Sequence, residues 1–185
     1  MSGKITCYLD CGNKPPWTLE AKAKYGNYET KRAKQYFGVP EIRVPSFFPI
    51  LSLLPQRALC YVKEAHPEHF VNIFLDIFTA MWKHQKDVSK PEILAEVLQQ
   101  RLNGDQVQDV MAKAGSAPYK QRLNDNTKEA LDRGAFGCPW FFVRNSQGKE
   151  EPFFGSDRFL YLWEFLGLQW KDVELLPPGS TKAKM

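Results

Sequence analysis

The chain has 185 residues, of which 43% are apolar and 14% are aromatic, so it can bury one sizeable hydrophobic core. Its formal charge of +4 is mild and its lysines and arginines are scattered, which argues against nucleic acid, because that partner favours a clustered basic face. No apolar run reaches the length of a membrane span, and no signal or transit pattern opens the chain. We therefore expect an intracellular protein of one domain, or of one domain with an insertion, and no membrane partner.

The first part of the chain predicts one strand and one helix. Residues 4–9 alternate β-branched and aromatic side chains, which is typical of a strand. The run Gly12-Asn13-Lys14-Pro15-Pro16 then breaks regular structure. Residues 28–37 predict a polar helix that ends at Gly38, and residues 45–55 predict a proline-rich connector.

From about residue 55 to residue 134 the pattern becomes helical. The clearest helix is predicted over residues 68–85, and others over residues 91–100, 105–114 and 118–133. The helix over residues 68–85 carries an apolar stripe at helical spacing, which we interpret as core and not as a cofactor site. The stripe consists of Val71, Phe74, Leu75, Phe78, Met81 and Trp82.

The last part of the chain predicts a hairpin and a helix. Strands are expected over residues 140–143 and 152–154, joined by the turn Asn145-Ser146-Gln147-Gly148, and a helix over residues 156–166. Pro139 directly precedes the first of these strands, so the Cys138–Pro139 bond is a candidate cis peptide. A cis proline there would turn the backbone of Cys138 outward, where an extended peptide could pair with it.

Three motifs and the helical block between them resemble one family. The motifs are Gly12-Asn13-Lys14-Pro15-Pro16, Gly134-Ala135-Phe136-Gly137-Cys138-Pro139 and Phe154-Gly155-Ser156-Asp157-Arg158. From residue 12 to about 170 the chain resembles kappa-class glutathione transferases, which are relatives of hydroxychromene-carboxylate isomerases and DsbA-like oxidoreductases. The resemblance implies an α/β, thioredoxin-like fold of the DsbA and kappa type, with a large all-helical insertion and a truncated N-terminal βαβ unit. It also implies glutathione as co-substrate, a small electrophilic substrate and a homodimer.

The resemblance further implies a set of glutathione contacts. Ser156 would cap the last helix, whose free N–H groups would bind the α-carboxylate of the γ-glutamyl group. Asp157 would bind the neighbouring ammonium, and the backbone of Cys138 ahead of Pro139 would pair with the cysteinyl backbone. The set is completed by two further polar contacts, Asn13 and, for the glycyl carboxylate, Lys22.

The sequence departs from this family at its first turn. In the family a Tyr-Asp at the end of the first strand is followed within a few residues by a serine turn, whose hydroxyl stabilises the glutathione thiolate. Here Tyr8-Leu9-Asp10 is present, but Cys11 leads straight into Gly12. The first helix and second strand of the family, and its catalytic serine, are therefore absent, and no catalytic residue is assigned.

The cysteines and histidines offer alternative sites. Cys7 and Cys11 would lie roughly 13 Å apart on a strand, too far for a disulfide, and no Cys-x-x-Cys motif opens a helix. Cys11 falls near the active-site turn of the family and could be reactive, or could be an ordinary buried thiol. His66 and His69 match no zinc-finger spacing, so no metal site is expected.

Three functions remain open from the sequence. The first is a kappa-type glutathione transferase that conjugates electrophiles or reduces peroxides. The second is a catalytically impaired truncated paralogue that acts as a dimer subunit or ligand binder, and the third is a glutathione-dependent isomerase. Ala183-Lys184-Met185 resembles a peroxisomal address, with mitochondrial or cytosolic location as the alternatives. The predicted domains are an incomplete thioredoxin-like domain (residues 1–44 and 125–176), a helical insertion (45–124) and a flexible tail (177–185).

Overall fold

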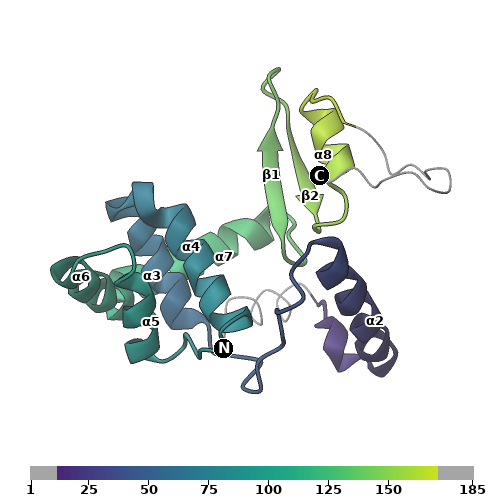
Figure 1. Cartoon of the computed structure of the whole chain (residues 1–185). Coiled ribbons are helices and arrows are strands. Elements are labelled where there is room, and N and C mark those ends of the chain that lie inside the picture. Colours follow the sequence, from purple (N-terminus) through teal and green to yellow (C-terminus); the bar gives the residue numbers. More distant parts are fainter. Residues whose placement is uncertain (1–11, 171–185) are drawn as a thin grey trace. The chain divides into compact units, whose positions relative to one another are not determined.

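A computed structural model describes residues 12–170, which form two compact units (Figure 1). One unit ends at Phe136 and the other begins at Gly137. The expected first strand, Cys7, Cys11 and the C-terminal tail lie outside the described residues, and the three predicted domains stay a prediction. Within residues 12–170, no helix combines the length and the apolar character that crossing a membrane requires.

The first unit is built of helices around a buried apolar core. Helix α3 is central, because it packs against α4, α6 and α7. The fully buried large side chains are Val62, Ile73, Val88, Leu94, Val97, Leu98 and Val110. The elements are η1 (Pro16–Thr18), α2 (Glu20–Tyr36), α3 (Leu53–Ala65), α4 (Pro67–Trp82), α5 (Pro91–Leu98), α6 (Gly104–Gly115) and α7 (Ala117–Asp132).

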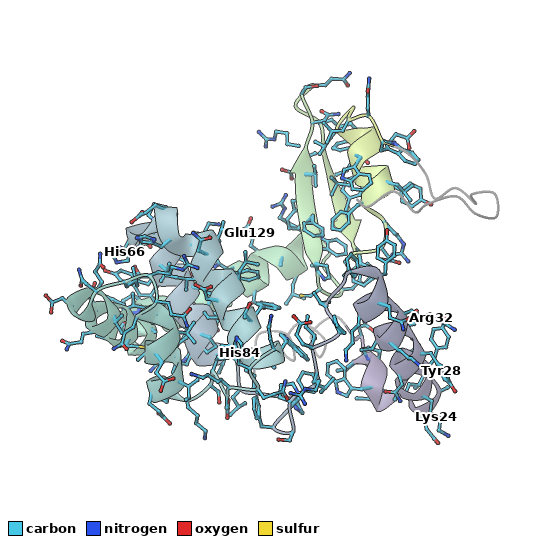
Figure 2. All side chains as sticks on the ribbon, viewed as in Figure 1. Lys24, Tyr28, Arg32, His66, His84 and Glu129 are labelled. Atoms are coloured by element: carbon cyan, nitrogen blue, oxygen red, sulfur yellow. The ribbon has the colours of Figure 1, made fainter. Side chains whose placement is uncertain are left out.

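Helix α2 begins eight residues earlier than the predicted helix. Its first turns contain good helix formers but little apolar periodicity, so the sequence pattern does not reveal them. No residue of α2 is buried, and Lys24, Tyr28 and Arg32 lie at successive turns along its surface (Figure 2). The predicted end is confirmed, because Gly38 adopts φ of +66° directly after the helix.

Helix α3 begins inside the predicted proline-rich connector. Pro55 is buried in the first turn of the helix. Proline is tolerated there, because the first backbone N–H groups of a helix have no partner within the helix. The connector therefore ends at Ser52, three residues before Pro55 and not at it.

Helix α4 corrects the prediction for the apolar stripe. Met81 is buried, and Trp82 packs against the core. The other four side chains face away from the core and are well exposed, while Ile73 and Ile77 fill the buried face in their place. The exposed fractions are 62% for Val71, 40% for Phe74, 54% for Leu75 and 44% for Phe78.

The second unit is a two-stranded hairpin with a helix on one face. Strands β1 (Trp140–Arg144) and β2 (Glu150–Phe154) pair antiparallel, as the sequence predicts, and are followed by α8 (Phe159–Phe165). Alternate side chains of a strand point to opposite faces. The rings of Phe141 and Phe153 accordingly contact those of Phe159 and Phe165 on α8, at centroid distances of 5.9 and 5.5 Å.

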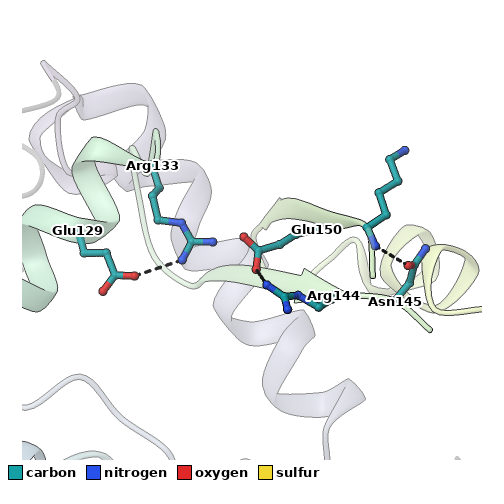
Figure 3. Close-up of polar contacts among 6 residues, drawn as sticks. Glu129, Arg133, Arg144, Asn145 and Glu150 are labelled. Carbon is teal, nitrogen blue, oxygen red and sulfur yellow. Dashed lines mark hydrogen bonds and ion pairs between the residues drawn. The ribbon is translucent and has the colours of Figure 1, made fainter. Parts of the chain in front are cut away.

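The predicted turn of the hairpin is confirmed, and Asn145 holds it. Its Oδ1 accepts the backbone N–H groups of Gln147 and Lys149, each at 3.0 Å, and one of these two bonds is drawn in Figure 3. Gly148 supplies the positive φ, +78°, that the turn needs. Arg144 and Glu150 form an ion pair across the strands at 3.8 Å. The turn therefore fixes the register of the hairpin at its closed end. The register in turn determines which residues lie opposite each other at the open end, where β1 begins and β2 ends.

Candidate functional site

Two segments that the sequence predicts to bind a ligand meet at the open end of the hairpin. The register pairs Trp140 with Phe154, and the N–H of Gly155 then donates to the carbonyl oxygen of Pro139 at 3.0 Å. Proline has no N–H, so this carbonyl is the backbone group that it can contribute to the extended ladder. Cys138 directly precedes Pro139 in the chain, and Ser156 and Asp157 directly follow Gly155. The structure thus brings the segment that carries Cys138 and Pro139 next to the segment that carries Ser156 and Asp157.

The Cys138–Pro139 peptide bond is cis, as the sequence predicts. The structure contains a second cis bond within the described residues, Phe48–Pro49, which the sequence reading missed. Cys138 itself is exposed, while the preceding Gly137 is buried. A Cβ at Gly137 would lie only 2.7 Å from the Phe154 ring, so the approach of the chain to Cys138 requires glycine.

Gly155 shapes the segment that carries Asp157. Its φ is +92°, and a Cβ there would lie 2.5 Å from Oδ1 of Asp157. The missing side chain therefore lets the carboxylate of Asp157 lie against the backbone of Gly155. This carboxylate is 71% exposed and forms an ion pair with Arg158 at 3.9 Å. An ammonium group of a ligand can therefore reach it.

Arg158 is a residue for which the sequence predicts no role. Its guanidinium lies over the ring of Phe154, 6.0 Å from the centroid, and Nη1 is 3.5 Å from the carbonyl oxygen of Phe154. These contacts hold a cation beside Asp157. The clue in the sequence is its place at the end of the Phe154–Arg158 motif.

The structure corrects the role predicted for Ser156. Helix α8 begins at Phe159, three residues later than expected, and its N-cap residue is Arg158, with no side-chain cap bond. Ser156 lies instead in the exposed bend between β2 and α8. It therefore does not cap the last helix, and the argument that a helix N-terminus binds the glutamyl carboxylate loses its basis. Ser156 remains the residue directly after Gly155, whose N–H donates to Pro139.

The predicted contacts Asn13 and Lys22 belong to the first unit. The Nδ2 of Asn13 donates to the carbonyl oxygen of Phe136 at 2.8 Å, and its Oδ1 accepts the N–H of Lys14. These bonds hold the loop before η1 to the last residue of the unit, directly before Gly137 in the chain. Lys22 is exposed in the first turn of α2. An anion could reach its ammonium there.

The alternative sites gain little support in the part of the chain that the structure describes. Burial raises the pKa of the Cys60 thiol, which lowers the fraction of reactive thiolate. His66 precedes α4 and His84 follows its end, so the two lie at opposite ends of that helix (Figure 2). Residues 12–170 contain no group of three or more side chains suited to hold a metal ion.

A family model described as a DSBA-like thioredoxin domain matches residues 4–167, which is most of the chain. The chain belongs to the DsbA-like thioredoxin family. The predicted fold class is confirmed with it, and the all-helical first unit and small sheet of the described residues are consistent with a thioredoxin-like fold that carries a helical insertion.

Three relatives of this DsbA-like chain carry the name of the kappa class, which confirms the resemblance seen in the sequence. Glutathione S-transferase kappa 1 of Caenorhabditis elegans is 24% identical over 85% of this chain and 71% of its own length. Glutathione s-transferase kappa 2 of the same organism is 28% identical over 84% and 71%. Glutathione S-transferase kappa 1 of Rattus norvegicus is 29% identical over 87% and 73%. The relatives therefore support a glutathione transferase family for this chain.

Proposed function

We propose that this protein is a glutathione transferase of the kappa type, which conjugates glutathione to small electrophiles or uses it to reduce peroxides. The observation that carries the proposal is the register at the open end of the hairpin. It brings together the segments that carry Cys138, Pro139, Ser156 and Asp157, which are four of the six residues for which the family resemblance implies glutathione contacts. The names of the three kappa-class relatives support the same co-substrate.

In this proposal each residue binds or orients glutathione. The exposed carboxylate of Asp157 binds the γ-glutamyl ammonium, and the backbone of Cys138 pairs with the cysteinyl residue as a strand would. Ser156 donates its hydroxyl to the glutamyl carboxylate, with the guanidinium of Arg158 nearby. In conjugation, the bound thiol loses its proton to solvent, and the thiolate forms a C–S bond to the electrophile as a leaving group departs.

Calorimetric titration with glutathione tests the binding part of this proposal. Asp157→Ala removes the ammonium contact, so we expect its dissociation constant to rise at least tenfold, or about 1.4 kcal/mol. Glu164→Ala is the matched control, because it removes another exposed carboxylate of the same unit, on α8. A cooperatively folded wild-type protein that binds no glutathione would refute the proposal. So would an Asp157→Ala variant that binds as tightly as the Glu164→Ala control.

Two finer proposals complete this function. The protein forms a homodimer, as the family resemblance implies. A catalytically impaired relative that binds glutathione without turnover is the second candidate function, and the sequence favours it because Cys11 and Gly12 stand where the family has its serine turn. Turnover of a model electrophile by protein shown to bind glutathione would decide between the transferase and the binder.

A further inference from the structure

Helix α4 has two apolar sides, and only one of them packs in the core of its unit. Ile73, Ile77 and Ala80 fill the buried side. The opposite side carries the exposed Val71, Phe74, Leu75 and Phe78, which we call the outer face of α4. A helix that is apolar on both sides is normally covered on both sides. We propose that a second copy of this chain covers the outer face, which names the surface of the homodimer proposed above and rests on that proposal.

The outer face carries no charge of its own. The acidic residue in the middle of α4, Asp76, is turned aside and accepts a two-pronged bond from Arg101 at 2.7 and 3.2 Å. Lys83, at the end of the helix, forms an ion pair with Glu41 at 2.9 Å. Asp76 and Lys83 are therefore paired within one copy, while the exposed Glu68, in the first turn of α4, lies 3.7 Å from Nε2 of His69 at the edge of the face. Such a face favours an apolar partner surface over an acidic or basic one.

The spacing along α4 is self-complementary. The helix carries apolar residues at intervals of four, three and four positions, and this series of intervals is the same from either end of the helix. The residues are Val71, Leu75, Phe78 and Trp82. An antiparallel second copy therefore presents the same stripe, with the exposed Leu75 opposite the exposed Phe78 of the other copy, and Val71 opposite its half-buried Trp82 at the end of the seam. Antiparallel pairing also sets the two helix dipoles head to tail, whereas parallel pairing would align like ends.

The rings on this face are already ordered against one another. Phe74 lies 4.8 Å from Phe78 and 6.4 Å from Phe70, measured between ring centroids. Pairing two copies would therefore immobilise few additional side chains, which lowers the entropic cost of association. At these exposed fractions, the four side chains offer roughly 300–400 Å² per copy. Twice that area is about half of a standard interface, so we expect a micromolar dissociation constant and not a nanomolar one.

Sedimentation velocity over roughly 1–100 μM protein tests the inference, with calorimetric titration of glutathione on the same samples. The wild type should associate to a dimer. Leu75→Glu should raise the dimer dissociation constant at least tenfold, because it places a charge in the seam. Leu51→Glu is the matched control: Leu51 is equally apolar, is 63% exposed and lies off α4, so its dimer should be unchanged.

Mixing two variants tests the antiparallel register. Leu75→Glu and Phe78→Lys should each associate weakly alone, while their equimolar mixture should form a dimer, because the new charges of opposite sign meet across the seam. A wild type that stays monomeric at every concentration would overturn the inference. A dimer that survives Leu75→Glu would do the same, whatever the glutathione titration shows. Loss of glutathione binding with the dimer intact would count only against the proposed transferase.

Discussion

Gly155 offers the sharpest test of the site, because Gly148 provides a matched control in the same hairpin. Both glycines have positive φ, +92° and +78°. Alanine at either position pays the strain of that backbone region, about 1–2 kcal/mol. The surroundings differ: no atom lies within 4 Å of a Cβ at Gly148, whereas a Cβ at Gly155 would meet Oδ1 of Asp157 at 2.5 Å. The two variants therefore share the strain and differ in the displacement of Asp157.

The Gly155→Ala variant should lose glutathione affinity, and Gly148→Ala should keep it. Ordinary contact begins at 3.4 Å, so the carboxylate of Asp157 must retreat from 2.5 Å to at least that distance. Losing a charge-assisted contact to the ligand ammonium costs about 1.5–3 kcal/mol, or a roughly ten- to hundredfold weaker affinity. Thermal unfolding of both variants monitors the shared strain, and calorimetry measures the affinity. Equal glutathione affinity in the two variants would refute the assignment of Asp157.

Two further predictions concern the first unit. Leu94→Ala should lower the free energy of unfolding by about 2–5 kcal/mol, because Leu94 is fully buried. Leu75→Ala should change it by less than about 0.5 kcal/mol, because Leu75 is exposed. Urea unfolding of dilute protein measures both, and equal losses would contradict the assignment of Leu75 to the exposed side of α4. The carboxylate of Asp109 accepts the hydroxyl of Tyr61 and raises the pKa of Tyr61 to about 12, so this pair stabilises the fold below pH about 10 and loses its contribution toward pH 12. Tyr61→Phe should therefore cost about 0.5–1.5 kcal/mol at pH 8 and much less at pH 12, and a cost that does not change with pH would rule out this coupling.

Local chemistry explains what the sequence could predict. The hairpin follows from two short aromatic segments on either side of Asn145 and Gly148, which specify a tight turn. The ends of two helices follow from glycines with positive φ, Gly38 and Gly134. The bond from the N–H of Gly155 to the carbonyl oxygen of Pro139 is then a consequence of the register, since each residue is one position beyond a paired strand end.

The wrong predictions depend on packing that the pattern does not contain. The apolar stripe of α4 has correct helical spacing, but Ile73 and Ile77 form a second apolar side, and periodicity alone cannot tell which side meets the core. Ser156-Asp157 resembles the start of a helix, yet α8 starts at Phe159, where its rings first contact the hairpin. The Asn13 contact to Phe136 spans 123 residues and is likewise beyond local reasoning, although the resemblance selected Asn13.

The residues proposed to bind glutathione lie apart from the segment in which the family resemblance implies thiol activation. Cys138, Pro139, Ser156 and Asp157 are positioned by one hairpin, its turn and the packing of α8, all within the second unit. A two-stranded hairpin is marginal alone, so the contacts of Phe141 and Phe153 with α8 are what make this part of the site persistent. None of these contacts involves the segment in which the family keeps its serine. Glutathione binding can therefore be intact while the thiol pKa stays near its free value, and the Gly155→Ala and Gly148→Ala pair reports on binding alone. If the two glycine variants behave as expected and the wild type shows no turnover, the protein binds glutathione without catalysing a reaction. If turnover is present, a residue outside this hairpin activates the thiol.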